Sequence, residues 1–195
     1  MKDLILDFET LGNGKESDSF LIIDVAYLFF DMKDNNTFDE LTSRAKKFKF
    51  SLQEQMNEFK WVAEKDTLEW WKSQDKEAMK AIKPSSEDVS VREFVAEFKK
   101  DCAKHMPKRA WARGTDFDFP IMKRIFRQVG EDVNEAFKFW TVRDMRTFMD
   151  VMGNFELKDL GAIPPTGENV GFVKHDSRHD IAMDVLRIQY FMKGE

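Results

Sequence analysis

Apolar residues in the first fifty positions are grouped in short runs of the kind that form β-strands. Residues 4–8 make a short apolar stretch that borders two acids, and residues 20–30 make a longer run rich in β-branched and aromatic side chains. A polar, glycine-containing segment with the composition of a turn separates the two runs. Residues 46–52 have the pattern of a third strand. The order of these runs predicts an antiparallel meander.

Helical spacing replaces this pattern after the first fifty residues. Asp66-x-x-Glu69 resembles a capping box and predicts a helix that runs to residue 82 and stops at Pro84. Apolar residues at helical spacing predict a second helix over residues 90–104.

The second half of the chain predicts a strand, a turn and a helix in direct succession. Residues 109–113 are strand-like, residues 114–118 have turn composition, and helical spacing follows. A last short strand is expected at residues 140–143, and a loop at 161–174 leads to the final helix. That helix is indicated by apolar residues at i, i+4, i+7 and i+11: Ile181, Val185, Ile188 and Met192. Strands first and mixed helices later predict an α/β protein with helices against a mixed sheet, in a single domain over residues 1–195.

Composition narrows the possible classes of protein. Apolar runs are too short for a membrane span and the start of the chain has no signal-peptide pattern, so we expect a soluble, cytoplasmic protein without a membrane partner. The single cysteine, Cys102, excludes a disulfide framework and a cysteine-based zinc cluster. We therefore expect any metal to bind through oxygen ligands.

The net charge of −5 argues against a general nucleic-acid coat, which is normally basic. It is compatible with a nuclease, because a cluster of carboxylates is neutralised when divalent cations fill it. Local groups of cations could still touch phosphates, although a solvated face is the favoured interpretation of each. These groups are Lys46, Lys47 and Lys49; Lys104, Lys108 and Arg109; and Arg124 and Arg127.

Two acids stand at the end of the first predicted strand. The strand period of two places Asp7 and Glu9 on one face and Phe8 on the other. Like charges so close favour a metal site, because they repel unless a cation or a proton lies between them. Taken alone, a polar strand end explains the pair better.

A third acid, Asp118, follows the strand at 109–113 and stands at the start of a helix. Two interpretations of Asp118 stay open: it is a metal ligand, or it is the N-cap of the helix. Asp116 competes for the capping role.

The last candidate pattern is His175-x4-Asp180 at the start of the terminal helix. Ser177-x-x-Asp180 has the form of a capping box, which is the structural alternative for Asp180. His179 is a second possible imidazole. Its position one residue before Asp180 sends it to another side of a helix.

The ordered set of these motifs resembles the DEDDh exonuclease family. The matching segments are Asp-Phe-Glu-Thr near the start, Gly-Thr-Asp-Phe-Asp-Phe-Pro-Ile-Met in the middle, and His-x4-Asp near the end. Chain length, the Trp70-Trp71 pair and a Trp-x-x-Gly-x-x-Phe-Asp-x-Pro stretch resemble most closely the members of this family from T-even-like phages. The resemblance covers nearly the whole chain and implies a ribonuclease-H-like fold, a mixed β-sheet flanked by α-helices.

The resemblance also implies a mechanism. It indicates a 3′→5′ exonuclease that holds two divalent cations, Mg²⁺ or Mn²⁺, and hydrolyses single-stranded DNA with a free 3′ end to 5′-mononucleotides. It implies that Asp7 bridges both ions, that Glu9 and Asp180 hold the ion on the side of the attacking water, and that Asp118 supports the other. His175 is then the general base.

Resemblance places Thr10 and Leu11 beside the terminal nucleotide, although Leu11 is equally well explained as a core residue. Trp70 and Trp71 could stack on bases, but core packing is favoured for at least one of them. Arg113 could contact a phosphate or pair with a nearby acid.

Two rival functions stay open. An exoribonuclease or oligoribonuclease of the same fold is the first, because no residue can be assigned to reading a 2′-hydroxyl. A non-catalytic nucleic-acid-binding module is the second. The presence of all four acids and the histidine disfavours it.

Overall fold

A mixed five-stranded sheet forms the centre of the computed structural model, which describes residues 2–15, 18–74, 82–153 and 171–193. The strands lie in the order β3-β2-β1-β4-β5. They are β1 (Asp3–Thr10), β2 (Ile22–Phe30), β3 (Lys46–Lys49), β4 (Ala110–Ala112) and β5 (Val142–Asp144).

Strand directions divide the sheet into two parts. Strands β1, β2 and β3 pair antiparallel, which confirms the predicted meander. Strand β4 is parallel to both β1 and β5. The carboxyl ends of β1, β4 and β5 therefore meet at one edge of the sheet, and the segments that follow them are brought together there.

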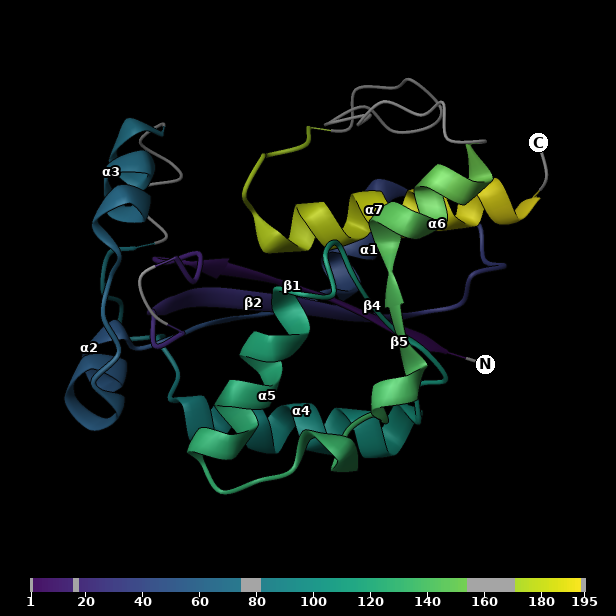
Figure 1. Cartoon of the computed structure of the whole chain (residues 1–195). Helices are drawn as coiled ribbons and strands as arrows, with labels where there is room; N and C mark the ends of the chain where they lie inside the picture. The colour runs from purple at the N-terminus through teal and green to yellow at the C-terminus, as the bar shows by residue number, and fades with distance from the viewer. Residues whose placement is uncertain (1, 16–17, 75–81, 154–170, 194–195) are drawn as a thin grey trace.

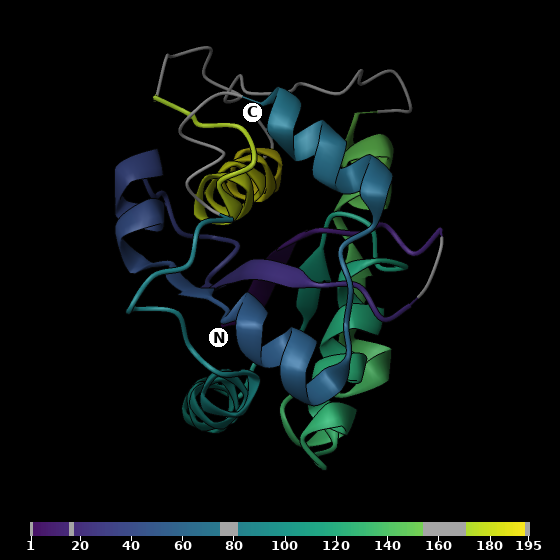
Figure 2. The ribbon, with the colours of Figure 1, turned by 90° about the vertical axis from the view of Figure 1, so that its left-hand side faces the viewer.

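Helices cover both faces of the sheet (Figure 1). Figure 2 looks along α4 and α7 nearly end-on, and the sheet lies between them. The helices are α1 (Phe38–Arg44), α2 (Leu52–Glu54), α3 (Lys65–Ser73), α4 (Val91–His105), α5 (Asp118–Gln128), α6 (Met145–Met152) and α7 (Ser177–Lys193). A short π-helical segment, Gln55–Phe59, continues α2.

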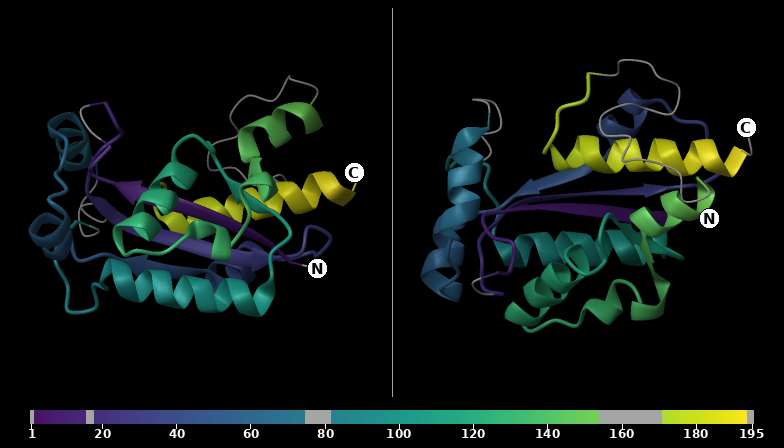
Figure 3. Two further views of the ribbon diagram at one scale, coloured as in Figure 1. Left: turned by 60° about the horizontal axis from the view of Figure 1, so that its bottom comes forward. Right: turned by 45° about the horizontal axis from the view of Figure 1, so that its top comes forward.

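The two faces of β1 belong to two different apolar clusters. Leu4, Leu6 and Phe8 pack with residues of α4 and α5, whereas Ile5 packs on the other side with residues of α1, α6 and α7. Because side chains alternate along a strand, Asp7 and Glu9 face the α7 side, where the apolar cluster ends. Helix α3 stands across the end of the sheet where β1 finishes (Figure 3).

Several predicted boundaries differ from the structure. The predicted capping box at Asp66 and Glu69 is wrong, because α3 begins at Lys65 after an N-cap, Glu64, that makes no side-chain capping bond. The Glu64 carboxylate instead accepts hydrogen bonds from the backbone N–H groups of Asn13 and Gly14, at 2.9 and 3.2 Å. Residues 75–81 and 154–170 of the predicted helix and loop lie outside the described residues.

Smaller differences concern strand ends and one missed helix. The last strand begins at Val142 and not at residue 140, because Phe139–Thr141 is a 3₁₀ turn. Helix α1 was not predicted, although Thr37-x-x-Glu40 forms the capping box that starts it. Helix α4, predicted over residues 90–104, begins at Val91 after an N-cap, Ser90, that forms a capping box with Glu93. In the described part of the chain we find no helix long and apolar enough to cross a bilayer.

Candidate active site

Three carboxylates converge at the carboxyl end of β1. Asp7 and Glu9 lie on the same face of the strand, as its alternation predicts, and Asp180 approaches them from the first turn of α7. One oxygen of each side chain lies within 4.8 Å of one oxygen of the others. This spacing lets the three side chains share a single cation.

Asp118 lines the same cavity, but it comes from the opposite face of the sheet. It is the first residue of α5 and is buried, and its Oδ1 accepts the backbone N–H of Phe8 at 3.1 Å. Phe117 occupies the N-cap without a side-chain bond, and Asp116 is exposed, so neither acid caps the helix. This bond holds Asp118 against β1 between Asp7 and Glu9. The other carboxylate oxygen, Oδ2, takes no part in it.

The four carboxylates line one cavity of about 250 Å³. Its other polar lining residues are Arg113, Arg146, His175 and Asp184.

The carboxyl groups share an environment that disfavours their charge when no cation is present. Burial raises the pKa of Asp7 well above its usual range, and the charges of Asp118, Glu9 and Asp180 raise it further. Burial raises the pKa of Asp118 to about 8 and that of Asp180 to about 7, and Glu9 adds to both shifts. Burial also raises the pKa of Glu9, although neighbouring His175 lowers it. Carboxylate oxygens that repel one another in this way are suitable ligands for divalent cations such as Mg²⁺ or Mn²⁺, because the cations offset the repulsion.

His175 lies at the mouth of the cavity, just before α7. Its Nδ1 is 3.7 Å from Oε1 of Glu9, which is longer than a hydrogen bond, and a quarter of its side chain is exposed. Its backbone has a left-handed φ of 64°. The imidazole packs nearly perpendicular to the ring of Trp70, with the ring centres 4.8 Å apart. A non-glycine residue is held in this conformation only where its surroundings favour it, as is common at functional sites.

His179 faces a different part of the molecule. Its Nδ1 accepts the backbone N–H of Val173 at 2.9 Å, and its ring packs edge-on against Phe38. The structure therefore separates the two candidate imidazoles, with His175 beside Glu9 and His179 turned toward α1.

A buried polar network fixes the start of α7. The Ser177 hydroxyl donates to Asp24 of β2 at 2.6 Å, and the Lys47 ammonium lies 3.2 Å from Asp24 and 3.5 Å from Asp176. The Ser177 side chain is engaged with Asp24, and Asp176 accepts the Arg178 N–H at 3.0 Å, so the capping box that was the structural alternative for Asp180 does not form. Asp180 is left facing the cavity.

A fifth carboxylate, Asp184, was missed by the sequence analysis. It lies one turn after Asp180, and its position at i+4 on the same helix is the signal that could have found it. Arg113 approaches it through both Nε and Nη2, and Arg187 donates to it at 3.0 Å. Asp184 is thus neutralised by arginines. This pairing favours the ion-pair interpretation of Arg113 over a phosphate contact.

The segment expected to meet the terminal nucleotide is held firmly. The Thr10 hydroxyl donates to the Gly12 carbonyl at 2.6 Å, and the Thr10 carbonyl accepts the indole N–H of Trp71 at 2.8 Å. Leu11 is only 3% exposed and belongs to the core cluster. Trp71 is buried, whereas Trp70 is 41% exposed beside His175. This division agrees with the expectation that at least one tryptophan packs in the core.

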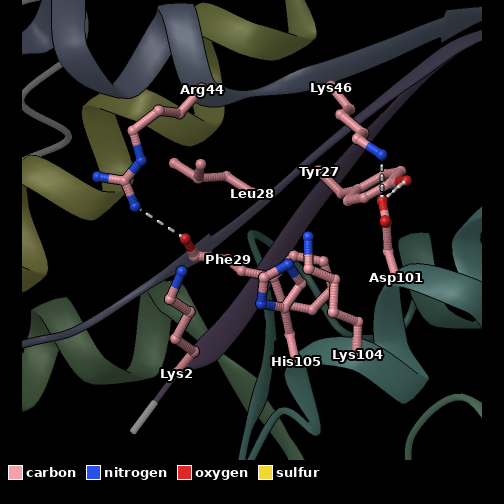
Figure 4. A pocket seen from close by; sticks show the side chains of 9 residues that line it. All are labelled: Lys2, Tyr27, Leu28, Phe29, Arg44, Lys46, Asp101, Lys104 and His105. Atoms are coloured by element: carbon pink, nitrogen blue, oxygen red, sulfur yellow. Dashed lines mark hydrogen bonds and ion pairs between the residues drawn. The ribbon is translucent and has the colours of Figure 1, made fainter.

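Among the described residues that line this cavity, none belongs to the basic groups noted in the sequence, although Lys47 lies beside it through its contact with Asp176. Lys46 and Lys104 both line a second cavity, of about 200 Å³, beside the carboxyl end of β2 (Figure 4). Lys46 is engaged there, because its ammonium bonds Asp101 at 2.6 Å. Arg44 in the last turn of α1, and Lys104 and His105 in the last turn of α4, also line this second cavity. Basic residues are favoured at these positions, because the carboxyl end of a helix carries partial negative charge.

Comparisons with known proteins identify the relatives of this chain. Residues 2–183 match the family model described as the 3′-5′ exoribonuclease Rv2179c-like domain. The exodeoxyribonuclease of Enterobacteria phage T4 is 38% identical over 211 residues, which cover 99% of this chain and 90% of that protein.

Among solved structures, product-bound exonuclease I superposes with a TM-score of 0.61 at 12% identity. The match covers 100% of this chain, which spans 43% of that longer one. At this identity the match supports the ribonuclease-H-like fold alone. The family match and the phage relative together show that this chain belongs to the Rv2179c-like family and is a DEDDh-type 3′→5′ exonuclease.

Proposed function

We propose that this exonuclease shortens single-stranded DNA stepwise from a free 3′ end and releases 5′-mononucleotides. The observation that carries the proposal is the convergence of four acids from three separate segments on one cavity, with His175 at its mouth. The acids are Asp7, Glu9, Asp118 and Asp180. We treat residues 1–195 as a single exonuclease domain that acts in the cytoplasm of an infected cell, since its relative is encoded by a phage.

The four acids would hold two cations, Mg²⁺ or Mn²⁺. Asp7 would serve both ions, because the charges of Asp118, Glu9 and Asp180 all act on it and raise its pKa. Glu9 and Asp180 would hold the ion on the side of His175, and Asp118 the other. Bound cations would offset the negative charge that develops on the scissile phosphate and would acidify a nearby water.

His175 would accept the proton of the attacking water. The water oxygen forms a bond to phosphorus, the bond from phosphorus to the 3′-oxygen breaks, and that oxygen leaves with the retained strand and takes up a proton. With Nδ1 turned toward Glu9, Nε2 is the nitrogen left to serve as the base. Such general-base assistance typically contributes about 10²–10⁴-fold to rate.

Thr10 and Leu11 would contact the terminal nucleotide. Leu11 can do so only at its 3% exposed surface, unless the segment moves when substrate binds. Trp70, exposed beside His175, is better placed to meet a base.

RNA is the second candidate substrate, since the matching family model describes an exoribonuclease. DNA is favoured because the phage relative, which matches over nearly its full length, is named an exodeoxyribonuclease. A non-catalytic binding module is disfavoured by the presence of every acid and of His175.

A time course on matched single-stranded DNA and RNA, labelled at either the 3′ or the 5′ end, tests this function. With Mg²⁺ we expect immediate release of the 3′ label as a 5′-mononucleotide and a ladder from the 5′-labelled strand. EDTA should stop both reactions. Cleavage of a circular single strand would overturn the exonuclease assignment, and much faster loss of RNA would favour the second substrate.

A further inference from the structure

Arg146 lines the carboxylate cavity from a helix outside the three sequence motifs. It is an exposed residue in the first turn of α6, a helix whose start is tied to the segment before Asp118. The Asp144 carboxylate makes this connection, because it accepts the backbone N–H groups of both Gly114 and Thr147, at 3.1 and 3.0 Å.

Helix electrostatics do not explain an arginine at this position. The start of a helix carries partial positive charge and favours acids, so a cation in the first turn is opposed by the helix dipole. The local sequence therefore does not explain this arginine, whereas the acids of the cavity offer it opposite charge. Departures from local preference of this kind are common at functional sites.

Gly114 provides the space that the guanidinium occupies. A Cβ added at Gly114 would overlap Nη1 of Arg146, so the guanidinium would have to shift from its present position. The backbone of Gly114 also has a φ of 106°, a conformation that favours glycine. The glycine of the Trp-x-x-Gly-x-x-Phe-Asp motif thus lets Arg146 reach the cavity.

The charge of Arg146 is available to a ligand. Within the described residues Arg146 makes no ion pair, whereas Arg113, the other arginine of the cavity, is bound to Asp184. A guanidinium presents several N–H donors in a planar fork that matches the oxygens of a phosphate.

Arg146 and His175 act on different acids of the cluster. Arg146 lies close enough to Asp118 to lower its pKa, whereas His175 acts on Glu9 and Asp180. In the proposed function His175 marks the side of the attacking water. Arg146 then lies on the side of Asp118, where the 3′-oxygen leaves with the retained strand.

We propose that Arg146 binds a backbone phosphate of the retained strand, the first one on the 5′ side of the scissile bond. This inference rests on the proposed function. Arg146 would recognise the negative charge of one phosphodiester, whatever the base and the sugar.

A thermodynamic cycle tests the contact. Wild type and Arg146→Ala are each given a single strand with normal linkages and one with a neutral methylphosphonate at that phosphate. Binding is measured by fluorescence anisotropy in EDTA, and cleavage with Mg²⁺ by single-turnover kinetics. We expect Arg146→Ala to weaken binding of the normal strand by about tenfold, as for a charged hydrogen bond.

On the methylphosphonate strand the two proteins should bind alike, because the charge that Arg146 recognises is gone. The dependence of binding on salt should also weaken in the variant, by about 0.7 in the log–log slope for one lost contact to a single strand. Arg143→Ala is the matched control, because the Arg143 guanidinium donates to the carbonyls of Trp140 and Val142. It should leave binding and cleavage unchanged.

An equal defect of Arg146→Ala on both strands would overturn the proposal and assign Arg146 a structural role as counter-ion of Asp118. Full activity of the variant on the normal strand would overturn it as well. Failure of the proposed function is distinguishable, because wild type itself would then leave the 3′-ended strand intact.

Discussion

At the scale of single residues, the two histidines near Asp180 differ in what surrounds them. His175 lies beside Glu9 at the mouth of the cavity, and His179 binds the Val173 N–H on the α1 side. We expect His175→Ala to lower kcat by about 10²-fold or more, because a base is lost while no cation ligand is removed. Metal-dependent thermal stabilisation should be unchanged.

His179→Ala is the matched control. It should leave kcat unchanged and lower the Tm slightly, because the contact to Val173 is lost. Loss of turnover in His179→Ala but not in His175→Ala would reverse the two roles.

The raised pKa of Asp118 predicts how stability depends on pH without metal. The carboxyl binds its proton more tightly in the folded protein, so the folded state binds more protons between the usual pKa of 3.8 and about 8. The free energy of unfolding contributed by this group is therefore greatest at low pH and falls as pH rises through that window.

Thermal unfolding in EDTA at several pH values checks this expectation. Asp118→Asn can still accept the Phe8 N–H but cannot ionise, so its Tm should fall less than that of wild type as pH rises toward 8. Parallel curves for the two proteins would show that Asp118 ionises as easily in the folded protein as in the unfolded chain.

At the scale of elements, α3 supports the end of β1 through one tryptophan of an adjacent pair. Trp71 is buried and donates to the Thr10 carbonyl, whereas Trp70 is partly exposed. Trp71→Phe removes this donor and part of the ring. We expect it to lower the free energy of unfolding by about 1–3 kcal/mol, from the unpaired carbonyl and the lost packing.

Denaturant unfolding measures this loss of stability. Trp71→Phe should also raise KM, because Thr10 and Leu11 lose their support, and steady-state kinetics with a single strand measure this effect. Trp70→Phe keeps an aromatic ring beside His175 and should retain wild-type stability. Equal stability losses in both variants would contradict the separate roles.

At the scale of the whole molecule, the site depends on strands that are parallel. Strands β1, β4 and β5 end at the same edge, so Asp7, Asp118 and Arg146 meet there although they are far apart in the sequence. The start of α7 adds Asp180 from the other face. Folding therefore brings the acids together against their repulsion, and cations should stabilise the folded state by binding to it preferentially.

We expect Mn²⁺ or Mg²⁺ to raise the Tm and to release protons when added near pH 7, because the raised pKa values leave some carboxyls protonated without metal. Calorimetric titration in buffers of different ionisation enthalpy measures the released protons. Asp7→Asn should abolish most of both effects. Full stabilisation of that variant by metal would place the cations elsewhere.

The sequence by itself determined much of the secondary structure, because this depends on local periodicity, and it identified the candidate acids through the order of the motifs that resemble the family. Alternation along β1 places Asp7 and Glu9 on one face, and the apolar stripe of α7 leaves Asp180 beside the core. The ordered motifs identified the family. These features need no knowledge of which elements meet in space.

Only the tertiary structure decided which side chains meet across elements. The pairing of Arg113 with Asp184, the bond from Ser177 to Asp24 and the approach of Arg146 over Gly114 each join distant segments. The failed capping box of α3 has the same cause, since Glu64 is held by the segment after β1. Local periodicity sets the face on which a side chain lies, but packing of the sheet and helices selects the partner that it finds there.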